Sequence, residues 1–277
     1  MTTKIVAQLP NTDIWLLDIK TSKDSIHLQN PVNITHRVGY DNQPAFSPDG
    51  KYILYTSIRE DKQADIYKYD LTSKTISQFT HTSTSEYSPT FTPDGRYISV
   101  IMVEPDSTQR LWKFPIHGGE PILVMKDIDS IGYHCWITKD SLAMIMITQP
   151  PTLEVVNVRT QKHSLLVSNA GRCITSVSQT LFFVQKQDST KFFLSNYIKD
   201  IKLREKNYYK LPNEDFAILL YQQPIYFTGV KSKVVASYPF KEKDIPVIDL
   251  AKYGISKITR IAISSDGTRM AIVAESK

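Results

Sequence analysis

Histidine and cysteine are the residue types in this chain that could hold a transition metal, and their spacing argues against a metal centre. A zinc site needs three or four such ligands that converge on one point. His36 and His81 each follow a strand-ending threonine in consecutive copies of a repeat described below, which favours structural loop positions one repeat apart. The chain has six histidines, at positions 27, 36, 81, 117, 134 and 163. The sequence therefore predicts no metal and no cofactor, with a lone calcium held by Asp41 and Glu86 as the alternative.

Nucleophilic catalysis has little support in the sequence. No Gly-x-Ser-x-Gly motif is present, which a serine hydrolase of the α/β type would carry on a strand-to-helix turn. No sequence motif pairs Cys135 or Cys173 with a histidine that could act as a general base, and both cysteines fall on predicted inner strands. They are interpreted as small buried residues, and a disulfide between them is left open because sequence does not give their distance.

Acid–base catalysis by paired carboxylates is the remaining possibility. Asp127 and Asp129 form one such pair, and Glu214 and Asp215 form another. A glycosidase needs two carboxyl groups at a defined separation across a cleft, whereas both pairs fall in connections between repeats. The sequence therefore assigns no catalytic residue.

A repeat supplies the elements that would position these side chains. One short segment occurs three times, as FSPDGKYI at 46–53, FTPDGRYI at 91–98 and ISSDGTRM at 263–270. Each copy predicts a strand, a turn built on aspartate and glycine, and a second strand. Asp49 and Asp94 stand 45 residues apart, and Asp266 follows 172 residues later, which is four steps of about 43 residues. This is the length of a four-stranded propeller blade, and the chain has room for six.

Four antiparallel strands are expected in each unit. In the two clearest units they are at 43–46, 52–57, 65–70 and 75–80, and at 88–91, 97–102, 110–114 and 121–124. Three weaker units have strands at 133–137, 141–147, 153–158 and 164–167; at 172–177, 180–186, 191–198 and 207–211; and at 216–221, 224–229, 234–240 and 245–250. Strands at 258–263 and 268–274 would join the strand at 13–19, so that one blade is shared between the termini and closes the ring. The predicted fold class is an all-β, six-bladed β-propeller that forms a single domain over residues 1–277.

The order Pro-x-Phe-Ser-Pro-Asp-Gly-Lys-Tyr-Ile (44–53), Asp-Ile-Tyr-x-x-Asp (65–70) and Phe-Thr (79–80) resembles the repeats of TolB-like six-bladed propellers. The resemblance is specific over 11–125 and 257–277. It implies a non-enzymatic scaffold that engages a protein or peptide of the cell envelope, and a periplasmic or secreted location with the signal segment removed. A cytoplasmic location stays open. Because oligogalacturonate lyases share related repeats, the alternative is a carbohydrate-active or metal-dependent enzyme of propeller fold, similar to a lyase or a glycosidase.

In such a propeller the innermost strands line a central channel, and ligands meet residues at its mouth. Alignment on the Asp-Gly turns places a mixed ring of charged and polar side chains there. The candidate ligand-binding residues are Asp41, Asn42, Glu86, Tyr87, Tyr133, His134, Arg172, Asp215 and Lys257. We expect this ring to form a polar binding funnel.

Composition is ordinary for a globular domain, with 41% hydrophobic and 22% charged residues. No apolar run approaches the length of a membrane span. The net charge of +5 is spread along the chain, and its densest stretch, residues 199–210, is interpreted as a solvated loop between strands. A nucleic-acid partner would need a concentrated basic face, so none is expected. A closed ring of this size is expected to be a monomer.

Overall fold

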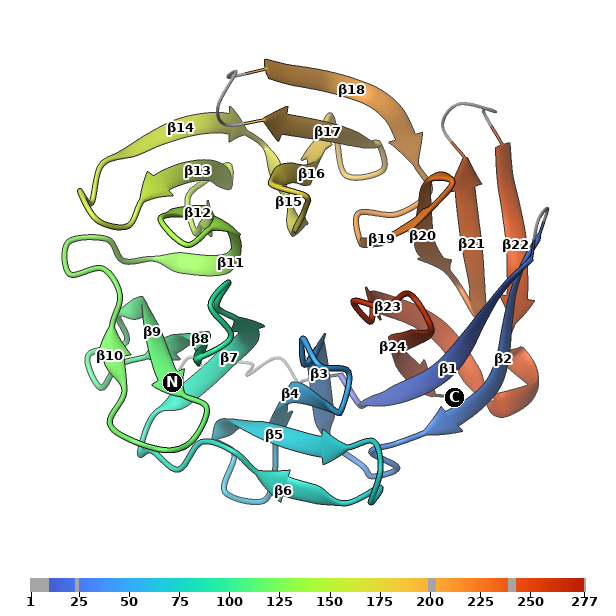
Figure 1. Cartoon of the computed structure of the whole chain (residues 1–277), viewed down its shortest axis with the longest axis horizontal. Helices are drawn as coiled ribbons and strands as arrows, with labels where there is room; N and C mark the ends of the chain where they lie inside the picture. The colour runs from blue at the N-terminus through green and yellow to red at the C-terminus, as the bar shows by residue number, and fades with distance from the viewer. Residues whose placement is uncertain (1–9, 23–24, 199–202, 239–242, 277) are drawn as a thin grey trace, which may run out of the picture.

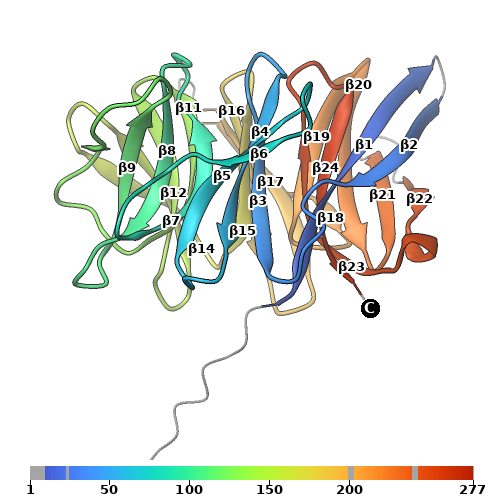
Figure 2. The ribbon, with the colours of Figure 1, turned by 90° about the horizontal axis from the view of Figure 1, so that it is seen from below.

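The structure is a computed structural model that describes residues 10–22, 25–198, 203–238 and 243–276. These residues form strands arranged around a central axis, with β3, β7, β11, β15, β19 and β23 nearest to it (Figure 1). Seen from the side, the strands run along the axis rather than across it (Figure 2). The chain is an all-β propeller, as the repeat predicted.

Four of the sheets contain four antiparallel strands each. The first holds β7 (Ser85–Phe91), β8 (Tyr97–Val103), β9 (Gln109–Pro115) and β10 (Ile122–Leu123). The second holds β11 (Ile131–Thr138), β12 (Ser141–Met146), β13 (Thr152–Asn157) and β14 (His163–Ser168). The third holds β15 (Ala170–Val177), β16 (Thr180–Lys186), β17 (Phe192–Ile198) and β18 (Leu203–Leu211). The fourth holds β19 (Phe216–Tyr221), β20 (Gln223–Val230), β21 (Lys233–Tyr238) and β22 (Lys243–Asp249).

The remaining sheet has eight strands and joins the two ends of the chain. Its strands are β1 (Thr12–Ser22), β2 (Ser25–Asn33), β3 (Tyr40–Phe46), β4 (Tyr52–Ile58), β5 (Ala64–Asp70), β6 (Ile76–Gln78), β23 (Ile255–Ile263) and β24 (Arg269–Ser276), and a 3₁₀ helix η2 (Ala251–Tyr253) precedes β23. β1 pairs antiparallel with β24, from Thr12 opposite Glu275 to Asp18 opposite Arg269. A single parallel bridge, Thr12 to Tyr40, joins β1 to β3. The sheet is therefore mixed, and its two halves meet at one residue pair.

One expectation about the outer strands is wrong. Arg204 and Lys206 lie in β18 rather than in a solvated loop, because this strand begins at Leu203, earlier than predicted, and Lys210 lies in the part of it that was predicted at 207–211. Its sequence lacks an apolar period, since an outermost strand has no further strand of its own sheet beyond it. Lys199 and Lys202 are outside the described residues.

The Asp-Gly turns are structural, as predicted. Asp49 Oδ1 accepts hydrogen bonds from Ser47 Oγ at 2.7 Å and from the Lys51 backbone N–H at 3.2 Å. Gly50 follows with a φ of 68°, a conformation that glycine adopts without steric cost. The turns at 92–95 and 264–267 repeat this arrangement. All three join an inner strand to the next strand out, and we call the side of the ring that carries them the turn face.

The apolar core occupies the spaces between neighbouring sheets. In the largest cluster, Phe227, Leu250 and Ile272 have no exposed surface. Gly229 permits the close approach of β20 and β23, because a Cβ at this position would lie 2.6 Å from the Ile258 side chain. Such packing holds the inner strands at fixed positions around the axis. Within the described residues no helix is long and apolar enough to cross a membrane.

Candidate functional site

The inner strands enclose a cavity of about 740 Å³ in the channel. All six of them contribute, and the cavity extends to the turn face at Ser178, at Tyr221 and at residues 264–268. Its volume lies within the range of small-ligand and peptide side-chain pockets. We call it the channel cavity.

A charged cluster forms the floor of the channel cavity. Arg260 Nη2 donates a hydrogen bond to Tyr133 Oη at 2.9 Å, and its guanidinium lies over the Tyr133 ring at 5.0 Å. The Asp215 Oδ2 atom lies 3.7 Å from Arg260 Nη1 and 3.6 Å from Arg172 Nε, beyond hydrogen-bonding distance in both cases. Asp215 Oδ1 accepts from the Ile261 backbone N–H at 3.1 Å, which fixes this carboxylate between the two cations.

Burial controls the titration of the floor. Asp215 is 3% exposed, and burial raises its pKa above the ordinary value, although Arg260 and Arg172 oppose this effect. Burial also raises the pKa of Tyr40, a neighbouring phenol at the beginning of β3 and outside the cavity lining, to about 12. Glu214 and Lys186 form an ion pair behind Arg172, and Glu214 Oε1 is 3.5 Å from Arg172 Nε. At neutral pH the phenol is uncharged and both guanidiniums are cations.

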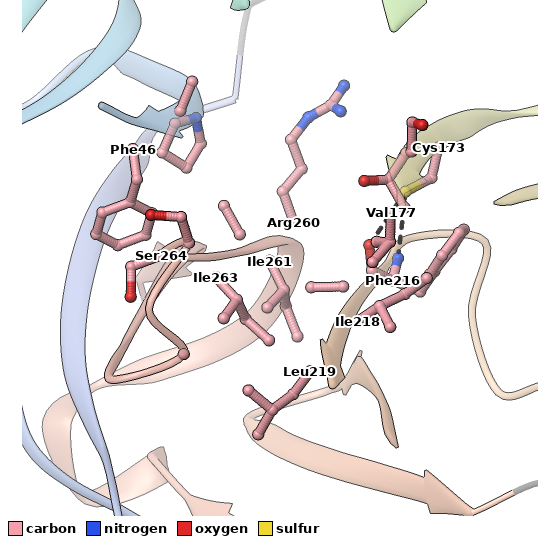
Figure 3. Close-up of a pocket in the computed structure, with 18 of the residues that line it drawn as sticks. Phe46, Cys173, Val177, Phe216, Ile218, Leu219, Arg260, Ile261, Ile263 and Ser264 are labelled. Carbon is pink, nitrogen blue, oxygen red and sulfur yellow. Dashed lines mark hydrogen bonds between the residues drawn. The ribbon is translucent and has the colours of Figure 1, made fainter. Parts of the chain in front are cut away.

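Apolar side chains form the walls between the floor and the turn face. Figure 3 shows Ile218, Leu219 and Ile263 on one side and Phe46 on another, with the Arg260 side chain directed away from Leu219. The Cys173 thiol donates a hydrogen bond to the Phe216 carbonyl in this wall at 3.2 Å (Figure 3). The cavity therefore combines a cationic floor with apolar walls.

Four of the predicted ligand-binding residues, Tyr133, His134, Arg172 and Asp215, line the channel cavity. The others do not. Asp41, Asn42, Glu86 and Tyr87 lie near the beginnings of β3 and β7, and Lys257 lies near the beginning of β23, away from the cavity lining. The structure thus divides the predicted ring into two groups.

Asp41 and Glu86 are fully buried and engaged by residues near them in the fold. Asp41 accepts hydrogen bonds from Ser57 Oγ at 2.6 Å and from Arg37 Nη1 at 3.2 Å. Glu86 Oε1 accepts from the Thr82 hydroxyl and from the Thr84 hydroxyl at 3.2 Å. Burial raises the pKa of Glu86 to about 7. Neither carboxylate is exposed to a ligand.

Sequence reasoning missed Gln43, Ser88 and Arg260, which do line the channel cavity. Each stands six residues before the aspartate of its turn, so this offset was a usable signal. The alignment instead chose positions nearer the strand beginnings. Register shifts near these positions, including the one between Ile258 and Arg260, change which residues face the channel.

The serine–histidine contact near the floor is not a catalytic pair. Ser99 Oγ lies 2.7 Å from His134 Nε2, but Ser99 donates its proton to the Thr90 carbonyl at 3.1 Å and accepts from Trp136 Nε1 at 2.9 Å. Burial lowers the pKa of His134 to about 3, so the ring is neutral. His134 Nδ1 has no hydrogen-bond partner among the described residues, so no third group orients it.

The cysteines are free thiols. Burial raises the pKa of Cys135 to about 12 and raises that of Cys173 further, which leaves both protonated and unreactive at neutral pH. Among the described residues, no three or more histidine, cysteine, aspartate or glutamate side chains are placed to hold a metal ion. The cavity therefore holds no assembled nucleophile among these groups.

Comparisons with known proteins bear on the fold. No family model matches the sequence, and no curated protein matches it. A structure described as TolB from Agrobacterium tumefaciens is 13% identical, with a TM-score of 0.68 over 96% of this chain and 99% of that chain. A chain of a nidogen/laminin complex is 13% identical, with a TM-score of 0.63 over 94% and 98%. An oligogalacturonate lyase in complex with manganese is 10% identical, with a TM-score of 0.57 over 91% and 82%.

These likenesses cover nearly the whole chain at low identity, so they concern the arrangement of strands and not the chemistry of the cavity. The resemblance first carried by the Asp-Gly repeat is the one that the solved structures support. The chain has the fold of a TolB-like propeller.

Proposed function

We propose that this chain is a non-enzymatic scaffold of the TolB-like type, which engages a protein or peptide of the cell envelope through the channel cavity. In this proposal the propeller is one domain over residues 1–277 with six blades. The single parallel bridge between Thr12 and Tyr40 supports counting the eight-stranded sheet as two blades, one of them shared by the termini. The protein acts as a monomer in the periplasm or outside the cell.

The observation that carries the proposal is the cavity itself. Its volume can take a side chain or a chain end, it has a charged floor and apolar walls, and Tyr133, His134, Arg172 and Asp215 line it. Peptide recognition commonly combines these features, because apolar pockets supply affinity and a few polar groups supply orientation. The protonated thiols and the engaged Ser99 hydroxyl favour binding over turnover.

The test is selection of displayed random peptides on the immobilised protein, followed by fluorescence anisotropy with each selected peptide. Ile218→Trp is expected to fill the channel cavity and weaken binding by at least about ten-fold, or about 1.4 kcal/mol. The matched control is Leu165→Trp, which adds the same ring at an exposed position on β14. Peptides that bind both variants as well as the wild type would contradict the proposal.

The alternative function is a carbohydrate-active or metal-dependent enzyme of propeller fold. The likeness to the oligogalacturonate lyase in complex with manganese favours it. Oligogalacturonate incubated with the protein and manganese would then yield an unsaturated product, detected by ultraviolet absorbance. We expect no product, and clear turnover that is lost on adding a chelator would replace the scaffold proposal.

A further inference from the structure

We infer that the floor of the channel cavity binds a carboxylate of the peptide partner, held between Arg172 and Arg260. The inference rests on the proposed function and deepens it, because it names the chemical group that the site selects. Three observations support it: the N–H groups of the two arginines left unpaired within the described residues, the burial of Asp215 between them, and the contact of Arg260 with Tyr133 across the channel.

The two guanidiniums keep most of their hydrogen-bond donors. Each carries five N–H groups. Arg172 donates from Nη2 to the Thr259 carbonyl at 2.7 Å, and Arg260 donates from Nη2 to Tyr133. Arg172 Nε is buried and faces Glu214 and Asp215 at 3.5 and 3.6 Å, so the donors that remain for a ligand are on the guanidinium ends. The carboxylates already at the floor, Asp215 and Glu214, lie 3.5 Å or more from both guanidiniums, so most of the N–H groups stay available, and a carboxylate is the strongest acceptor that a peptide offers.

Asp215 compensates charge at the floor without using these donors. Its Oδ2 atom is more than 3.5 Å from both guanidiniums, and its Oδ1 atom is occupied by the Ile261 N–H. Because Asp215 is 3% exposed, a cationic ligand group has no access to it. The cavity thus presents guanidinium edges to an incoming group, which favours an anion over a cation.

The hydrogen bond from Arg260 to Tyr133 crosses the channel at the floor of the cavity. Arg260 is on β23 and Tyr133 is on β11, and these strands lie on opposite sides of the central axis (Figure 1). Their contact spans the channel, so a ligand that enters from the turn face meets the floor end-on. A side-chain carboxylate or a free carboxyl terminus suits this geometry, since both place the charge at the end of a chain.

Apolar surface continues from the cavity across the turn face. A second hollow of about 490 Å³ shares Ser176 and Ser178 with the channel cavity and is lined by Phe91, Pro93 and Trp136. Residues that flank the carboxylate in a bound peptide would lie on this surface. The favoured occupant is therefore an acidic residue or chain end with apolar neighbours.

The experiment uses two probes of the same shape, 3-phenylpropionate and the uncharged 3-phenylpropanamide, titrated into isotope-labelled protein and followed by NMR. The carboxylate is expected to bind at least about ten-fold more tightly, as one charge-assisted hydrogen bond would provide. Arg172→Gln and Arg260→Gln should each abolish that difference. Arg159→Gln, which removes an exposed arginine paired with Asp140 on another sheet, should keep it.

Arg260 is largely buried beside Asp215, so its loss could unfold the protein; Arg172, whose side chain is 32% exposed, gives the independent variant. Circular dichroism identifies a folded variant before titration. Equal affinities for the two probes in the wild type would overturn the inference, and so would a difference that survives in folded Arg172→Gln.

A second arm separates this inference from the proposed function. Peptides selected on the protein are compared with versions in which acidic residues become amides or the carboxyl terminus is amidated. Retained binding of both versions would overturn the carboxylate inference and leave the scaffold proposal standing. If 3-phenylpropionate and trigalacturonate bind through Arg172 while no peptide does, the peptide partner is overturned and the carboxylate belongs to a sugar acid.

Discussion

The charged groups at the beginnings of the inner strands differ from those at the floor of the channel cavity in their access to a ligand. Where the inner strands begin, Asp41 and Glu86 are fully buried and are engaged by nearby hydroxyl groups of the fold. Farther along the strands, at the floor of the channel cavity, Arg172 and Arg260 lie around Asp215, whose Oδ2 atom is beyond hydrogen-bonding distance of both. Glu86 Oε2 also has no hydrogen-bond partner among the described residues, but Glu86 is fully buried and does not line the channel cavity. The comparison teaches that charge predicts a ligand only where unused hydrogen-bonding capacity faces an open cavity.

The largest effect is expected from Asp215→Ala. This change leaves the Arg260 guanidinium buried without its counter-charge, and breaking such a pair typically lowers the free energy of unfolding by about 3–5 kcal/mol. Urea denaturation measures the loss. Asp188→Ala, which removes an exposed carboxylate in the loop after β16, serves as the control and should cost much less. Equal losses would mean that the two arginines do not depend on Asp215, and the floor described above would need another counter-ion.

At the opposite end, Glu86→Gln is expected to change how stability depends on pH. Burial raises the pKa of Glu86 from 4.5 to about 7, so between these values the folded protein holds a proton that the unfolded chain releases. Stability from this group is fully present below about pH 4.5 and is lost as pH rises through 7. We therefore compare the free energy of unfolding of the variant with that of the wild type at two pH values. Between pH 4 and pH 8 this difference should shift in favour of the variant by up to about 3 kcal/mol.

Urea denaturation of both proteins at the two pH values gives this difference, in which the other titrating groups cancel. Parallel pH profiles would show that Glu86 keeps an ordinary pKa. In that case this carboxylate would be solvated, and the contrast between the two channel ends would disappear.

The propeller was predictable because its turns have a local chemistry that recurs. Asp49, Asp94 and Asp266 each cap their own turn, so three short motifs fix the period and the places of the neighbouring strands. The first residues of strand β18 were not predicted, because an outermost strand shows no alternation of apolar residues. The expected boundaries were closest for the second strands β4, β8, β12 and β16, which agree within one residue, whereas most innermost strands begin two or three residues earlier than expected.

The residues that line the cavity were less predictable, because strand register decides which side chains face the channel. A register shift in β23 separates Lys257 from Arg260, and similar shifts occur in β3 and β7. Counting back from a turn across such a shift selects a residue with a different environment. The pairing of Arg260 with Tyr133 joins residues 127 positions apart, which no local pattern encodes.

The smallest effect is expected from Lys257→Ala, and this variant tests the comparison along a single strand. The Lys257 side chain is 60% exposed and pairs with Glu275 at 3.0 Å, a surface contact worth less than about 1 kcal/mol. Three residues later, Arg260 faces the channel cavity. We therefore expect Lys257→Ala to leave the affinity for 3-phenylpropionate unchanged, whereas Arg260→Gln weakens it by at least about ten-fold. The same NMR titration measures both, and a weakened affinity in Lys257→Ala would place the ligand near the beginning of β23, so that the two channel ends would form one site.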